Sequence, residues 1–441
     1  MNEDALSGRL LDLAHEHGVP GGQFALRHDG ATHSVLFGEE EAGSGRPVRE
    51  DSKFPTGSIT KAFTAALAMV LVDEGDLDLD LPLADQLPEL RVSDASFGEK
   101  QTLRQLLSHS SGLPPGRDSD DLAETTRRRY LADCARMRPI PECGSSFSYS
   151  NIGYVVTGFL VEHVARMEWR EALETILLTP LGVEPAYITP PAGRPHVPGH
   201  AARAAGAAAL PVRQTLPRIE AAAGALALSA ADLLAYGLLH TDDAPGVPGL
   251  LDAEALVPMG RPVPGADPFG LADGWGLGLS RYRAGDGSWR VGHDGTSDGT
   301  SCHLRVDPAT GTVAALTTNA NTGMALWEEL TAELAADGLD LAGYSYSGAD
   351  RERGEVPAPP ECQGTYENGD TTYTIDLAAD GEARLKVGGE PFARLTFHED
   401  LSFTMRELAA NRLSYLGRFL RAPETGRLEQ IQVTGRRAQR V

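Results

Sequence analysis

Lysine is scarce in this chain, in which only four of the 39 basic residues are lysines and the others are arginines. Arginine replaces lysine well as a surface charge, but its pKa above about 12 prevents it from accepting a proton. A lysine that such a chain retains is therefore a candidate for chemistry that arginine cannot perform. The four lysines are Lys53, Lys61, Lys100 and Lys386.

Signals for export and for membrane insertion are also missing from the sequence. Residues 1–4 are acidic in net charge, and no apolar region of a signal peptide follows them. The longest apolar stretch, 62–72, is too short to span a bilayer. We therefore expect a cytoplasmic protein that does not bind a membrane. The formal net charge of −23 also argues against nucleic acid as a partner, because binding it requires a basic surface.

Metal and cofactor motifs are lacking as well. The chain contains no H-E-x-x-H motif, no C-x-x-C pair and no glycine-rich nucleotide-binding loop, so we expect neither a metal ion nor a nucleotide cofactor. Widely spaced cysteines in a reducing compartment predict free thiols rather than disulfides. The cysteines are Cys134, Cys143, Cys302 and Cys362.

The length of 441 residues exceeds what one hydrophobic core usually serves, so we expect more than one domain. Helices broken by proline and glycine loops are predicted over about 83–211, and strand patterns return between 274 and 318. The proline-containing stretch 346–361 has few apolar side chains and predicts a linker. Beyond it, 362–441 alternates apolar and polar residues in short runs, which predicts a small antiparallel barrel or sandwich.

Two local patterns predict particular turns. Asp29 and Gly30 between alternating segments indicate a β-hairpin. Ser229, followed three residues later by Asp232, indicates a capping box at the start of a helix.

The first chemical motif is Ser58-Ile59-Thr60-Lys61, which follows a glycine at the start of a predicted helix. Positions i and i+3 of a helix share a face, so the Ser58 hydroxyl and the Lys61 amine can meet. A serine hydroxyl is a weak nucleophile until a neighbouring base takes its proton, and a desolvated lysine can serve as that base. Of the four lysines, only Lys61 has serine three positions before it.

The second motif is Tyr149-Ser150-Asn151, about ninety residues further along the chain. The Tyr149 phenol can shuttle protons, and the Asn151 amide can donate to a substrate carbonyl and hold Lys61. A second Tyr-x-Asn, formed by Tyr366 and Asn368, precedes a glycine in the C-terminal domain and is interpreted as a hairpin.

The third motif is His293-Asp294-Gly295-Thr296 on a predicted strand, with a further glycine before the histidine. The glycines allow a substrate backbone to approach closely. A lone histidine is more often structural than functional, but here its position between two glycines and after the other two motifs favours a role in the site.

The order S-x-x-K, Y-x-N, H-x-G resembles the class C β-lactamase, D-stereospecific peptidase and esterase branch of the penicillin-recognising enzymes. The loop 106–113, Leu-Leu-Ser-His-Ser-Ser-Gly-Leu, resembles a hallmark loop of that family. The resemblance implies an α/β catalytic domain over 1–345, with an antiparallel sheet flanked by helices and an all-α insertion at about 83–211. A linker at 346–361 and a lipocalin-like antiparallel β-barrel at 362–441 complete the expected architecture.

The resemblance also implies a role for each motif residue. Ser58 is the nucleophile, Lys61 accepts its proton, and Tyr149 protonates the leaving group and then activates the incoming one. Asn151 positions the substrate, and the N–H groups of Ser58 and Thr296 form the oxyanion hole. Many lactamases and transpeptidases have Lys-Thr-Gly at the third motif, and the only K-x-G of this chain, at 386–388, lies in the C-terminal domain.

The combination of a missing export signal and an appended β domain resembles the penicillin-binding-protein-type thioesterases. These standalone enzymes release non-ribosomal peptides as macrolactams from carrier-protein thioesters, typically through a C-terminal D-residue. The expected partners are thus a peptidyl substrate and the carrier protein that presents it. In this reading Asp294, with Gly295 and Thr296, binds the substrate and holds its amine, and Arg436 is a further candidate for substrate binding.

Three other functions use the same residues or the same fold. The first is a D-stereospecific peptidase, amidase or esterase that uses water as the acceptor. The second is a β-lactamase, which the histidine of the third motif disfavours. The third is a sensor or binding module that retains the fold, which the presence of Ser58, Lys61 and Tyr149 together disfavours.

Overall fold

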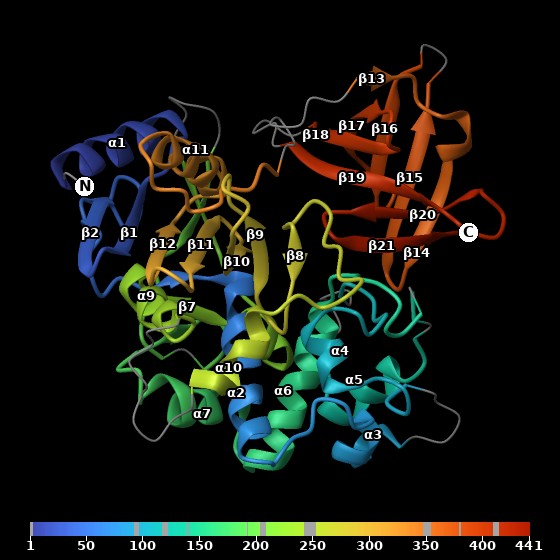
Figure 1. Cartoon of the computed structure of the whole chain (residues 1–441), viewed down its shortest axis with the longest axis horizontal. Coiled ribbons are helices and arrows are strands. Elements are labelled where there is room, and N and C mark those ends of the chain that lie inside the picture. The colour runs from blue at the N-terminus through green and yellow to red at the C-terminus, as the bar shows by residue number, and fades with distance from the viewer. Residues whose placement is uncertain are drawn as a thin grey trace. The chain divides into compact units, whose positions relative to one another are not determined.

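The computed structural model describes most of the chain and divides it into two compact units (Figure 1). The first unit comprises Met1–Leu79, Tyr154–Pro262 and Gly276–Gly343, and the second comprises Asp80–Gly153, Val263–Trp275 and Tyr344–Val441. The described residues are 3–91, 97–116, 122–137, 139–140, 142–191, 193–202, 209–241, 253–346, 354–378, 381–408 and 414–441.

An antiparallel sheet forms the centre of the first unit, with its strands in the order β2-β1-β12-β11-β10-β9. Asp29 and Gly30 have φ angles of 50° and 77° in the turn between β1 and β2, which confirms the predicted hairpin. The strands are β1 (Gly21–His28), β2 (Ala31–Gly38), β9 (Ser280–Arg283), β10 (Trp289–Ser297), β11 (Thr300–Asp307) and β12 (Thr312–Thr318).

Helices cover both faces of this sheet, and the central strands β11 and β12 are therefore buried on both sides. On one face α1 (Glu3–Glu16) and α11 (Gly323–Ala336) lie side by side and bury leucines and Trp327 against β1 and β12 (Figure 1). On the other face α9 (Ala230–Leu238) packs against β12, β1 and β11. Ser229 and Asp232 form the predicted capping box at the start of α9.

The remaining elements of the first unit include α2 (Thr60–Asp73), a helix whose residues are nearly all buried. The apolar run that was too short for a membrane span is thus the core helix of this unit. No helix in the part of the chain that the structure describes is long and apolar enough to cross a membrane. The other elements are β3 (Phe54–Pro55), η1 (Gly57–Ile59), α6 (Asn151–Ala165, which starts in the second unit), α7 (Trp169–Ala172), η4 (Leu173–Leu178), β4 (Ala186–Tyr187), β5 (Gly199–Ala201), β6 (Leu210–Val212), η5 (Arg218–Glu220), α8 (Ala221–Gly224), β7 (Leu226–Leu228) and α10 (Ala253–Gly260).

The second unit contains short helices from the predicted insertion and a closed antiparallel barrel of eight strands, β14 to β21. The barrel closes because β14 pairs with β21 and β17 pairs with β18. Its strands are β14 (Gly364–Asn368), β15 (Thr371–Leu377), β16 (Ala383–Val387), β17 (Glu390–His398), β18 (Ser402–Glu407), β19 (Ser414–Arg421), β20 (Leu428–Val433) and β21 (Arg436–Arg440). The unit also contains α3 (Leu83–Gln86), η2 (Pro88–Leu90), α4 (Leu103–Leu107), α5 (Arg127–Cys134), β8 (Gly274–Trp275), β13 (Glu355–Val356) and η6 (Pro360–Cys362).

The barrel confirms the alternation of apolar and polar residues that predicted its strands. Phe397, Phe403, Phe419 and Ile431 point into one buried cluster, as period-2 strands with a single buried face require. Tyr366 and Asn368 lie on β14 immediately before a hairpin turn, also as predicted. The domain boundaries expected at 345 and 361 stay predictions, and residues 347–353 of the expected linker lie outside the described part of the chain.

Candidate active site

Ser58 and Lys61 meet in the first unit as their spacing predicts. Ser58 lies in the turn η1, which leads directly into α2. The Lys61 Nζ donates to Ser58 Oγ over 3.0 Å and to the carbonyl oxygen of Ala223 in α8 over 2.7 Å. Lys61 is 1% exposed, so its amine is withdrawn from bulk water. A hydroxyl and a buried amine in this geometry can exchange a proton.

Two glycines allow strand β10 to lie directly against the turn that carries Ser58. A Cβ atom on Gly57, whose φ is +50°, would lie 2.1 Å from the carbonyl oxygen of Thr296. A Cβ atom on Gly295 would lie 2.0 Å from the carbonyl oxygen of Thr56. No side chain fits at either position, so the backbone of Thr296 lies beside the Ser58 turn. This arrangement brings together the two segments whose N–H groups are expected to hold an oxyanion.

His293 is buried in the first unit and is neutral near pH 7. Its side chain is 2% exposed, and its Nδ1 donates to the carbonyl oxygen of Asp294 over 2.6 Å. Burial, with the charge of Lys61 as the next cause, lowers the pKa of His293 to about 4. The third motif therefore provides a neutral imidazole where Lys-Thr-Gly enzymes have a cation.

The depressed pKa of His293 predicts a loss of stability in mild acid. His293 takes up a proton near pH 6.5 in the unfolded chain but only near pH 4 in the folded chain. Its contribution to the free energy of unfolding is therefore fully present above pH 6.5 and is lost as the pH falls towards 4. This difference corresponds to about 3 kcal/mol. Urea unfolding at several pH values should show a steeper decline in the wild type than in His293→Gln, and equal slopes would contradict the prediction. His240, whose pKa burial lowers to about 4, contributes equally in both proteins.

Asp294 does not lie where its place in the third motif predicted. Successive side chains of a strand point to opposite faces, so Asp294 faces away from the side on which Gly295 contacts the Ser58 turn. Its carboxylate accepts hydrogen bonds from His303 Nδ1 at 2.6 Å and from the Tyr282 hydroxyl at 2.6 Å. It also binds both terminal nitrogens of Arg305, at 2.8 and 3.0 Å. The prediction that Asp294 holds a substrate amine is therefore replaced by a structural role.

The residues around Asp294 form a buried polar network under β10. Arg305 is fully buried, and its guanidinium lies 3.4 Å from the ring centroid of Tyr282. The ring of His303 stacks on Trp327 of α11, at 5.1 Å between centroids. Burial alone would raise the pKa of Asp294, but the charge of Arg305 and the bonds from His303 hold it well below 3.8.

Tyr149 lies in the second unit, within a cluster of aromatic rings. It is 4% exposed, and its ring centroid lies 4.2 Å from that of His109 and 5.9 Å from that of Trp275. His109 Nδ1 accepts a hydrogen bond from the backbone N–H of Ser150 over 3.1 Å. His109 belongs to the loop 106–113 that carried part of the family resemblance, but no sequence motif predicted a role for it. The structure shows that it supports the tyrosine motif.

Asn151 and Arg436 also lie in the second unit, close to Tyr149. Asn151 opens α6, and its backbone N–H donates to the carbonyl oxygen of Pro115 over 2.8 Å. Arg436 opens β21 of the barrel, with its guanidinium 4.9 Å from the ring centroid of Tyr149. Its Nη1 donates to the carbonyl and hydroxyl oxygens of Thr434. The structure thus brings the predicted residues together in two groups, one in each unit.

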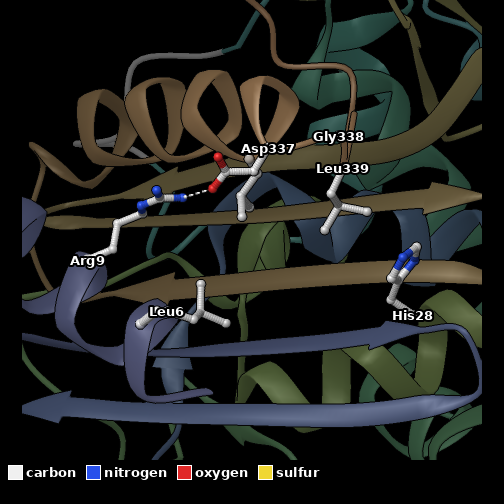
Figure 2. A pocket seen from close by; sticks show the side chains of 8 residues that line it. Leu6, Arg9, His28, Asp337, Gly338 and Leu339 are labelled. Atoms are coloured by element: carbon white, nitrogen blue, oxygen red, sulfur yellow. Dashed lines mark hydrogen bonds and ion pairs between the residues drawn. The ribbon is translucent and has the colours of Figure 1, made fainter. Parts of the chain in front are cut away.

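Other candidate features do not contribute to either group. Lys386 pairs with Asp376 in the barrel, and the four cysteines are free thiols. Within the described residues, no cluster of three or more histidine, cysteine or acidic side chains could hold a metal ion. Figure 2 shows a pocket in the first unit where Arg9 pairs with Asp337, and it contains none of the predicted site residues. That pocket is lined by Ala5, Leu6, Arg9, His28, Leu334, Asp337, Gly338 and Leu339.

A helix-flanked antiparallel sheet with a serine–lysine pair at the start of its core helix defines a serine hydrolase of the β-lactamase and penicillin-binding-protein type. The chain belongs to the Beta-lactamase family, whose model matches residues 6–338. It is 35% identical over 365 residues to penicillin-binding protein 4 of Amycolatopsis lactamdurans, an alignment that covers 80% of this chain and 92% of that protein.

Solved structures extend this likeness to the barrel. The crystal structure of SurE matches with a TM-score of 0.84 and 39% identity, over 100% of this chain and 99% of SurE. A second crystal structure of SurE, with D-Leu, matches with a TM-score of 0.83 and 37% identity. A D-stereospecific amidohydrolase from Streptomyces sp. matches with a TM-score of 0.59 and 27% identity, over 73% of this chain and 95% of that protein.

Proposed function

We propose that this protein is a penicillin-binding-protein-type thioesterase, which takes a peptidyl group from a carrier-protein thioester and releases it as a macrolactam. The observation that carries the acyl-transfer chemistry is the hydrogen bond of 3.0 Å between Lys61 Nζ and Ser58 Oγ. The likeness to SurE covers the barrel as well as the catalytic domain, and this combination of domains is the one on which the resemblance to the thioesterases rests.

In the first step Ser58 becomes acylated. Lys61 takes the hydroxyl proton while Ser58 Oγ forms a bond to the thioester carbonyl carbon. The developing oxyanion is held by the N–H groups of Ser58 and Thr296, which lie on adjoining segments. The C–S bond then breaks, and Tyr149 protonates the leaving thiolate. Tyr149 and Asn151 lie in the second unit, and their assignment to this reaction rests on the resemblance of the ordered motifs S-x-x-K, Y-x-N and H-x-G to those of the penicillin-recognising enzymes.

In the second step the N-terminal amine of the peptide resolves the ester. The amine attacks the carbonyl carbon, a C–N bond forms and the C–O bond to Ser58 breaks. The Tyr149 phenolate takes the proton that the amine loses, and Lys61 returns its proton to Ser58 Oγ, so both groups are back in their starting states. The sum of the two steps converts a linear thioester into a cyclic amide and a free thiol.

A D-residue at the acylating end of the peptide is the second element of the proposal. SurE has been crystallised with D-Leu, and the amidohydrolase from Streptomyces sp. is described as D-stereospecific. Both proteins match this chain at more than 25% identity, so a preference for D-configured acyl donors is the expectation that these relatives support.

The alternative is a D-specific amidase or peptidase, in which water resolves the same acyl-enzyme. The 27% identity to the D-stereospecific amidohydrolase favours this second candidate. A β-lactamase is less well supported, because the neutral His293 provides no cation for the carboxylate that β-lactams carry.

The test of the proposal uses a linear peptide that ends in D-Leu, presented as its N-acetylcysteamine thioester. The wild-type protein should form an adduct of the peptidyl mass, visible by intact mass spectrometry, and Ser58→Ala should not. Chromatography with mass detection should then show a cyclic product that is lighter than the linear acid by one water. If linear acid is the only product, the protein is a hydrolase and not a cyclase. If no adduct forms with either D-ended or L-ended thioesters, both proposed functions are contradicted.

A further inference from the structure

The turn between β20 and β21 of the barrel binds the loop that carries Tyr149. The backbone N–H of Tyr149 donates to the carbonyl oxygen of Gly435 over 3.0 Å. The backbone N–H of Arg437 donates to Ser148 Oγ over 3.2 Å, and the Arg436 guanidinium lies over the Tyr149 ring. Three consecutive barrel residues therefore contact two consecutive residues of the loop.

Gly435, at the centre of this turn, is closely packed against its neighbours. Gly435 has a φ of +75°, and its N–H donates to the carbonyl oxygen of Phe269 over 2.9 Å. A Cβ atom at this position would lie 2.4 Å from Leu271 Cδ1 and 3.2 Å from Phe147 Cε1. Glycine is thus required at Gly435 both by its backbone conformation and by its neighbours.

A second contact, through Asn368, connects the barrel to the same region. Asn368 is 1% exposed, and its Nδ2 donates to the carbonyl oxygen of Arg437 over 2.6 Å and to that of Ile140 over 3.4 Å. The adjacent Gly369 leaves room for Pro114, whose Cβ would be 2.7 Å from a Cβ atom on the glycine. The carbonyl oxygen of Pro114 in turn accepts from Ser150 Oγ over 2.6 Å.

If the barrel only packed against the loop that carries Tyr149, apolar contacts would be enough. Here a barrel carbonyl also accepts a hydrogen bond from the backbone N–H of Tyr149 itself, a residue that is 4% exposed. A catalytic phenol acts only when its oxygen is held in a narrow range of positions, and displacement by about 1 Å can reduce a rate about a hundredfold.

We propose that Gly435 is a positioning residue for Tyr149, so that this turn of the barrel helps to hold the catalytic tyrosine in place. The inference rests on the proposed role of Tyr149 in acyl transfer. Gly435 acts through the loop, with Ser148 and Asn368 holding the turn in register, and makes no contact with the reacting atoms.

The test compares two glycines of the barrel that both have positive φ. Gly435→Ala should displace the turn and reduce kcat for the D-Leu-ended thioester by about tenfold to a hundredfold, with KM changed less than about twofold. The matched control is Gly426→Ala. Gly426 has a φ of +69°, but a Cβ atom there would meet nothing within 4 Å, so the backbone strain is similar and the Tyr149 loop is untouched. Equal kcat values for the two variants would overturn the inference.

A double-mutant cycle separates positioning from general damage to the fold. If Gly435 acts through Tyr149, Gly435→Ala should have little further effect on kcat in a Tyr149→Phe background. A full additional loss in that background would refute the inference. Should Gly435→Ala fail to fold, Ser148→Ala, which removes only the acceptor for Arg437 N–H, takes its place in the cycle. If Tyr149→Phe alone leaves kcat unchanged, the proposed role of Tyr149 fails, and with it the premise of the inference.

Discussion

Replacing Lys61 with methionine is expected to reduce the rate of Ser58 acylation by about 10²- to 10⁴-fold, the range typical of a general base. Methionine fills a similar buried volume without an amine. The substitution removes the hydrogen bond of 3.0 Å to Ser58 Oγ, and with it the base that accepts the proton of this hydroxyl. The rate of adduct formation, followed by intact mass spectrometry under single-turnover conditions, measures the effect directly.

Lys61→Arg decides whether the amine acts as a base or only as a positive charge. A guanidinium keeps the charge but cannot accept the serine proton, because its pKa is above about 12. Arginine should therefore be as inactive as methionine. Substantial activity in Lys61→Arg would assign Lys61 an electrostatic role and require a different base. Circular dichroism of both variants should match that of the wild type, so that a loss of activity is not a loss of fold.

Removing the carboxylate in Asp294→Ala should destabilise the protein by about 3–5 kcal/mol, because it leaves the Arg305 guanidinium buried without its partner. Arg305 is fully buried and binds Asp294 through two nitrogens, at 2.8 and 3.0 Å. The pKa of Asp294 lies well below 3.8, so this contribution is present above about pH 4 and is lost only as the pH falls through the folded-state pKa. Urea unfolding at pH 7, followed by tryptophan fluorescence, measures the loss.

An exposed ion pair of the same unit provides the control for this prediction. Asp337 pairs with Arg9 at 3.0 Å, but their side chains are 64% and 32% exposed. Asp337→Ala should therefore change the free energy of unfolding by less than about 1 kcal/mol. The double variant Asp294→Leu with Arg305→Met should recover part of the loss, because it removes both charges together. If Asp294→Ala and Asp337→Ala have equal effects, the buried network does not stabilise the fold.

Much of the architecture could be predicted from short-range patterns. The Asp29–Gly30 hairpin and the capping box of Ser229 and Asp232 depend on residues within four positions of one another, and both are present. The barrel strands were predictable because a strand with one buried face alternates with a period of two. The fold class followed from three ordered motifs, and the family match over residues 6–338 confirms it.

Sequence patterns predicted the roles of individual polar residues less well than they predicted the architecture. The scarcity of lysine marked Lys53 as well as Lys61 for chemistry, yet Lys53 is 5% exposed and pairs with Asp232 at the start of α9. Asp294 was expected beside the substrate because it follows His293 in sequence. In a strand, however, neighbours in sequence point to opposite faces.

The sequence by itself determined the local chemistry of this protein. A spacing of three residues at the start of a helix places Ser58 and Lys61 within hydrogen-bonding distance, and no distant residue is needed for that. Only the tertiary structure decided that Asp294 belongs to a buried network with Arg305, and that a barrel turn at Gly435 holds the Tyr149 loop. The first contact depends on the face of the sheet to which a side chain points, and the second joins residues that are far apart in the chain. Such contacts arise from the packing of whole elements, which no short sequence pattern specifies.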